Sequence, residues 1–105
     1  MALTRYRVKT VADLGLLLRA VRRSSGLRLD DMAGCAGVGH VFAREVEHGK
    51  ETVQMGRVLK LLDEMGLHLT VDIPEPAVGE YDRLRETGLR PLKMRRRPKN
   101  GSEPR

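Results

Sequence analysis

Apolar residues recur every three or four positions along the first part of the chain, and this spacing predicts a series of helices. Counted with their caps, the predicted helical segments cover residues 10–26, 29–37, 40–49 and 52–66. Each segment ends at a glycine, the residue that most readily caps the carboxyl end of a helix. The glycines therefore divide this part of the chain into short helices joined by tight turns.

The first and fourth segments have apolar faces and candidate amino-terminal caps. Thr10 and Asp13 have the spacing of a capping box, and we expect Thr52 to cap the fourth helix. The apolar face of the first helix comprises Val11, Leu14, Leu17, Leu18 and Val21, and that of the fourth comprises Met55, Val58, Leu59, Leu62 and Met65. We expect both faces to be buried.

After Gly66 the apolar period changes from helical to alternating. The apolar positions are Leu67, Leu69, Val71 and Ile73, with one polar residue between each pair, until Pro74 ends the pattern. This alternation predicts a half-buried β-strand over residues 67–74. The weak stretch 6–10 is the only other candidate strand, so we expect the segment to pair with its own copy in a homodimer.

Composition favours a helical core and a polyanionic partner. Aromatic residues make up only 3% of the 105 residues, so Leu, Val, Met and Ala must build the core, which favours helices packed on helices. The net charge of +6 and the pI near 10.1 suit nucleic acid through counterion release. We expect one domain at 11–66, preceded at 1–10 by a basic arm or short strand and followed at 75–105 by a basic, largely disordered tail.

The cysteine content and the lengths of the apolar runs suggest where the protein is found. Cys35 has no partner for an intramolecular disulfide, and its small neighbours predict a buried structural thiol. No apolar run approaches the roughly 20 residues that cross a bilayer, and the amino terminus lacks the apolar stretch of a signal peptide. We expect a cytoplasmic protein without membrane contact.

Residues 29–47 have the pattern of a helix-turn-helix, in which two short helices are joined by Gly37, Val38 and Gly39. Gly37 permits the positive φ of the turn, and Ala33 supplies the small side chain required where the helices cross. Val38, Ala43 and Val46 are expected to point into the core, together with Phe42. A helical hairpin that binds nothing is the alternative for so short a pattern.

The sequence resembles the Xre/Cro family of phage-repressor-like regulators over about residues 11–69. The resemblance rests on Gly26 and Leu27 before the second helix and on Glu47, Gly49 and Lys50 at the ending of the third. Residues 54–63, QMGRVLKLLD, and the predicted strand are more narrowly similar to HipB-type antitoxins.

This resemblance implies an all-α, five-helix lambda-repressor-like domain whose C-terminal strand pairs across a dimer two-fold. It also implies a transcriptional repressor that binds an inverted repeat in double-stranded DNA and represses its own operon. The implied protein partner is a HipA-like Ser/Thr kinase toxin, made of one chain or split into two. Arg22 and Glu47 are implied to form a structural ion pair.

Carried over by resemblance, the DNA-binding positions are Gly39, His40, Val41, Arg44, His48 and Lys50. Arg44 suits guanine and Val41 suits a thymine methyl. Two departures weaken the carry-over: Leu29 stands where the family usually has a phosphate-binding Gln, and Gly39 replaces the usual Ser or Thr cap.

Several alternatives remain open at this point. The alternatives are a stand-alone Xre-family regulator and a protein-interaction adaptor that has lost DNA binding, the latter suggested by Leu29, Gly39 and Glu45. Binding of RNA through Arg95, Arg96, Arg97 and Lys99 is a further alternative. We assign a toxin-docking role to Tyr81, Leu84 and Leu89 within the tail, where residues 81–87 predict a short helix. We expect no enzymatic activity, metal or cofactor, because no catalytic or metal-binding motif is present.

Overall fold

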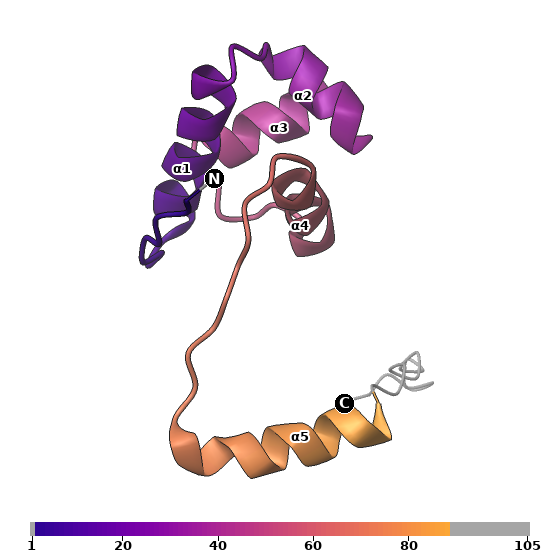
Figure 1. The fold of residues 1–105 in the computed structure, drawn as a ribbon. Helices are drawn as coiled ribbons and strands as arrows, with labels where there is room; N and C mark the ends of the chain where they lie inside the picture. Colours follow the sequence, from indigo (N-terminus) through magenta and orange to yellow (C-terminus); the bar gives the residue numbers. More distant parts are fainter. Residues whose placement is uncertain (1, 89–105) are drawn as a thin grey trace, which may run out of the picture. The chain divides into compact units, whose positions relative to one another are not determined.

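The computed structural model describes residues 2–88, and the chain divides into two units between Leu69 and Thr70. The elements are α1 (Val11–Ser24), α2 (Leu29–Ala36), α3 (His40–Glu47), α4 (Met55–Glu64), the 3₁₀ helix η1 (Glu75–Ala77) and α5 (Val78–Thr87) (Figure 1). No strand is present among these residues, so the all-α class is confirmed. No described helix has the length and hydropathy required to span a membrane.

Helix α1 begins with the capping box that the sequence predicts. The Thr10 hydroxyl accepts a hydrogen bond from Asp13 N–H at 3.0 Å, and the Asp13 carboxylate accepts one from Thr10 N–H at 3.1 Å. The same carboxylate accepts a further bond from Lys9 N–H at 2.9 Å. These donors, Lys9 N–H first, hold the pKa of Asp13 below its usual value.

The turn between α2 and α3 requires a glycine. Gly37 has a φ of 67°, in the left-handed region, and the next N–H, that of Val38, bonds back to the Ala33 carbonyl at 3.0 Å. This closes α2 after about two turns. The chain then reverses into α3, so the predicted helix–turn–helix connection is present.

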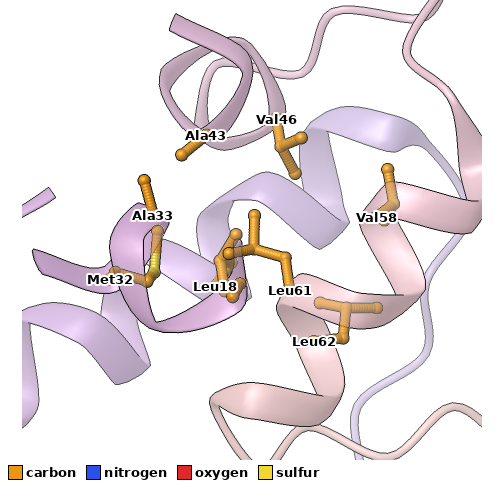
Figure 2. Packing of buried hydrophobic residues seen from close by; sticks show 9 residues of the cluster. Leu18, Met32, Ala33, Ala43, Val46, Val58, Leu61 and Leu62 are labelled. Carbon is orange, nitrogen blue, oxygen red and sulfur yellow. The ribbon is translucent and has the colours of Figure 1, made fainter. Parts of the chain in front are cut away.

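The core lies where α1, α2, α3 and α4 meet. Its buried apolar side chains are Leu18, Met32, Ala33, Ala36, Ala43, Val46, Val58, Leu61 and Leu62. The labelled side chains of four different helices point toward one another (Figure 2). Val38 and Phe42 are half-buried and pack against this cluster, as predicted. Burying one of its Leu, Val or Met side chains contributes roughly 1.5–3 kcal/mol.

The predictions for Cys35 and Thr52 are wrong. Cys35 is exposed, because the buried face of α2 is formed by Met32, Ala33 and Ala36 and Cys35 lies about 110° from its middle. Thr52 does not cap α4, which begins at Met55 after Gln54 without a side-chain cap. Residues 51–53 form a turn instead, and Val53 packs against the core.

Helix α4 buries only part of the expected apolar face and buries Leu61 in addition. Val58, Leu61 and Leu62 are buried, whereas Met55 is 59% exposed and Leu59 is 45% exposed. Leu59 lines a shallow groove with Leu62, Asp63 and residues 67–69. The unit therefore has an uncovered apolar surface beside the end of α4.

Residues 67–74 have no regular secondary structure in the single chain. The predicted strand would pair with a second chain, so the pairing stays a prediction. In the second unit, η1 leads into α5, which begins at Val78, three residues before the helical stretch predicted in the tail. Leu89 and the basic residues at 95–99 lie outside the described residues.

Candidate nucleic-acid interface

Helix α3 has one face in the core and one in solvent. Ala43, Val46 and Glu47 are buried, and α3 packs against both α1 and α2. On the other side, His40, Val41, Arg44 and His48 are exposed or half-exposed. The split follows from the helical repeat, because residues 41, 44 and 48 are spaced to share one face.

The solvent face of α3 is hollowed and chemically mixed. Val41, 65% exposed, lines a shallow groove together with Arg44, Glu45 and His48. The structure thus brings three of the six predicted DNA-binding residues into one surface. Gly39 is exposed at the amino-terminal cap without a side-chain hydrogen bond, and His40 follows it. Lys50 lies in the loop after the helix.

The ring of His48 is oriented by the helix itself. Its Nδ1 lies 2.9 Å from the carbonyl oxygen of Arg44. A carbonyl oxygen only accepts hydrogen bonds, so Nδ1 carries the proton and donates it. In the neutral ring Nε2 is then an acceptor, which suits the amino group of adenine or cytosine in a major groove.

Lys50 is paired with Glu45, a contact that no motif in the sequence predicts. Its Nζ lies 3.0 Å from the Glu45 carboxylate, and the Lys50 N–H also bonds to the Glu45 carbonyl. Both side chains are substantially exposed, so the ion pair contributes only about 0–1 kcal/mol. A phosphate can therefore compete for this ammonium at small cost, and the pairing offsets the negative charge of Glu45 beside the groove.

The structure contains the Arg22–Glu47 ion pair. Arg22 Nε and Nη2 donate to the two Glu47 carboxylate oxygens at 2.5 and 2.9 Å, and Glu47 is only 3% exposed. The hydrogen bonds to Glu47 raise the pKa of Arg22. Arg22 Nη1 also donates to the Leu27 carbonyl at 3.0 Å, so one guanidinium ties α1 to α3 and to the loop before α2.

Arg19 is a second cation at this contact. Its Nη2 donates to the Glu47 carbonyl at 2.9 Å, whereas its buried Nε has no hydrogen-bond partner and lies 3.9 Å from the Glu47 carboxylate. The sequence offers one sign of this role, because Arg19 lies one turn before Arg22 on the same helix.

Two glycines allow α1 to approach the end of α3 closely. A Cβ at Gly15 would lie 2.5 Å from the Val46 carbonyl oxygen and 2.8 Å from that of Glu47. A Cβ at Gly49 would lie 2.8 Å from Ala12 Cα, and Gly49 has a φ of 77°. The end of α3 is thus seated directly on the first turns of α1, and the direction of its solvent face is fixed.

The remaining predicted site residues lie on other segments. Leu67 packs against the core, whereas Leu69, Val71 and Ile73 are exposed in the single chain, Val71 to 83%. Tyr81 and Leu84 are exposed on α5, which has no buried residue.

Comparison with known proteins identifies the family. No family model matches the chain. The uncharacterized HTH-type transcriptional regulator y4mF of Sinorhizobium fredii is 46% identical over 68 residues, which cover 65% of this chain and 90% of the relative. This chain belongs to the HTH-type transcriptional regulators. The family resemblance predicted from the sequence is confirmed, and the protein is a regulator and not an enzyme.

Solved structures agree with this HTH fold. HipB in the HipA-HipB-O2-O3 complex superposes with a TM-score of 0.61 at 15% identity, covering 68% of this chain and all of the HipB chain. HipB in the HipB-O4 20mer complex gives the same values. The restriction-modification controller protein C.AhdI of Aeromonas hydrophila has a TM-score of 0.50 at 26% identity, covering 55% of this chain and 88% of its own.

Proposed function

We propose that this HTH regulator is a homodimeric repressor that reads an inverted repeat in double-stranded DNA with the solvent face of α3. The observation that carries this proposal is the exposed surface of Val41, Arg44 and His48 on a helix whose opposite face is held in the core. An α-helix fits the major groove, where a guanidinium can bind guanine and an apolar side chain can contact a thymine methyl. The relative y4mF is an HTH-type transcriptional regulator, which supports the proposal.

The test is selection of duplexes by the protein from a random-sequence pool, followed by binding measurements on the selected duplex. We expect an inverted repeat whose half-sites are about 34–36 Å apart. Arg44→Ala should cost about 1–3 kcal/mol of discrimination at one base pair of each half-site. Fluorescence anisotropy with single-base variants of the duplex measures this loss.

Lys60→Ala is the matched control, because it removes one exposed cation from α4. It should leave base discrimination unchanged. If the wild-type protein enriches no sequence from the pool, the regulator has lost direct reading, and the adaptor interpretation replaces this proposal.

The homodimer proposal concerns the alternating residues 67–73. Leu69, Val71 and Ile73 expose large apolar side chains at every second position, and pairing with a second copy would cover one side of this row. Val71→Asp should dissociate the dimer, because a buried unpaired carboxylate is costly. Sedimentation at micromolar concentration measures the change.

Thr70→Asp is the control for that substitution, since the neighbouring side chain of a strand points to the opposite side. It should remain dimeric. A Val71→Asp protein that sediments as a dimer would remove this segment from the interface.

We further propose that α5 is a docking segment for a HipA-like Ser/Thr kinase toxin, of one chain or two. Tyr81 and Leu84 are half-exposed and one turn apart, on a ten-residue helix without a buried residue. An isolated helix of this length is marginal in water, so a partner is needed to stabilise it. The fold shared with HipB, which occurs in a complex with HipA, supports this choice.

The docking proposal is tested by truncating the chain after Pro74. The binding partner in this test is the kinase encoded by an adjacent reading frame. The truncated protein should fail to capture the kinase in a pull-down, whereas a truncation after Leu92, which keeps α5 and removes the basic residues 95–99, should still capture it. Equal capture would remove the segment from the interface. Absence of a kinase reading frame next to the gene would favour a stand-alone regulator.

A further inference from the structure

Residues 2–9 form an exposed, strongly basic segment that the α3 surface does not include. Arg5, Arg7 and Lys9 are its charged residues, it contains no acidic residue, and it has no helix or strand. We propose that this segment is a DNA-binding arm that binds backbone phosphates beside the bases read by α3. The inference rests on the proposed function of α3 and adds a second contact surface to it.

The root of the arm is fixed. Within the described residues, the hydrogen bonds of the segment are confined to its last residue, Lys9, whose N–H donates to the Asp13 carboxylate at 2.9 Å. The depressed pKa of Asp13 means that the carboxylate remains ionised at neutral pH and keeps its contacts with the Lys9 and Thr10 N–H groups. The residues before Lys9 are exposed and make no hydrogen bond within the described part of the chain.

The root lies beside the carboxyl end of α3, which is followed by His48 and the loop residue Lys50. Gly49 is packed on Ala12, so closely that a Cβ on Gly49 would lie 2.8 Å from Ala12 Cα, and Ala12 is only two residues after Thr10. The arm therefore leaves the domain next to the surface that we propose faces DNA. The other end of α1, near Ser25, lies away from this loop.

The reach and charge spacing of the arm suit a DNA backbone. Eight extended residues span at most about 27 Å, well beyond the roughly 6 Å width of a minor groove. In an extended chain the side chains of residues 5, 7 and 9 lie on one side, roughly 6.6 Å apart, so they can follow neighbouring phosphates. Among the acids at this end of the domain, Glu45 is paired with Lys50 and Glu47 with Arg22, whereas Asp13, bound by backbone N–H groups, and the exposed Glu51 keep their charges.

The test compares two double variants of the full chain that lose equal charge. Arg5→Ala/Arg7→Ala removes two cations of the arm, and Arg23→Ala/Lys60→Ala removes two exposed cations far along α1 and on α4. Binding is measured by fluorescence anisotropy at a series of salt concentrations. The probes are the selected duplex with and without flanking base pairs, and a duplex of unrelated sequence. Thermal unfolding by circular dichroism confirms that both variants fold.

We expect the arm variant to reduce the slope of log affinity against log salt by about 2 for each chain bound, on the flanked and the unrelated duplex alike. The control variant should keep the wild-type slope, and trimming the flanks should remove most of the difference. Equal slopes for the wild type and the arm variant on the flanked duplex would overturn the arm proposal. That outcome is distinct from failure of the α3 proposal, which would appear as no preference for the selected over the unrelated duplex.

Discussion

Glu47→Gln should lower the free energy of unfolding by about 3 kcal/mol, although the substitution preserves the size of the side chain. The substitution removes the charge that two arginines share at the contact between α1 and α3. Arg22 would keep a partly buried guanidinium without its carboxylate, and Arg19 would lose the nearest negative charge to its unpartnered Nε. Urea unfolding followed by circular dichroism measures the loss.

Two further variants separate the ion pair from other effects of the substitution. Glu64→Gln, on an exposed carboxylate of α4, should change stability by less than about 0.5 kcal/mol. Arg22→Met/Glu47→Leu should regain most of the lost stability, because an apolar pair of similar volume avoids the buried unpaired charge. A Glu47→Gln protein as stable as the wild type would show that the pair contributes no net stability.

Gly15→Ala should destabilise the domain by roughly 2 kcal/mol, even though alanine is the better helix former. The added methyl group would lie within 2.8 Å of two backbone carbonyl oxygens, those of Val46 and Glu47. Backbone atoms cannot rotate away, so α3 would have to move from α1, at a cost in the upper part of the ~1–3 kcal/mol range for overpacking. The gain in helix propensity offsets about 1 kcal/mol of that cost at most.

Gly34→Ala is the matched control, since Gly34 also lies inside a helix but a Cβ added there would have nothing within 4 Å. This variant should be more stable than the wild type by about 0.5–1 kcal/mol. Opposite signs for the two glycine variants in urea unfolding would support close packing of α1 on α3. A stabilised Gly15→Ala protein would contradict it.

The parts of the fold that the sequence predicts correctly depend on local interactions. The Thr10–Asp13 capping box joins residues three apart, and the left-handed Gly37 lies in a turn whose geometry excludes most other residues. Both are determined within one helical turn. The ion pair between Arg22 and Glu47 joins distant residues, and only the family resemblance predicts it.

The errors concern which side of a short element faces the core. Cys35 has small apolar neighbours, but on a helix of two turns the buried face is set by how α3 and α4 pack on it. Likewise Val53, in the turn before α4, packs against the core. Helix α4 begins only at Met55, so Thr52 is not its cap. The apolar period identifies the apolar face of a helix, but it does not show where the neighbouring helix ends. For this reason the pattern wrongly predicts that Leu59 is buried.

The candidate site can be predicted only in part, for the same reason. Val41, Arg44 and His48 share a face by spacing alone, so their common surface follows from the sequence once α3 is recognised. The Lys50–Glu45 pair and the His48 Nδ1 bond depend on side-chain rotamers in the last turn and the following loop. No spacing rule specifies those rotamers.

The separation of the two faces of α3 has a consequence for how such a regulator can evolve. Val41, Arg44 and His48 contribute nothing to the core, whereas Ala43, Val46 and Glu47 hold the helix in place. Under the proposed function, the outward residues can be exchanged among related chains without loss of folding, and each exchange would redirect the protein to another operator. Duplicated copies in one genome would then bind different operators because of differences at these three side chains, while keeping the same fold.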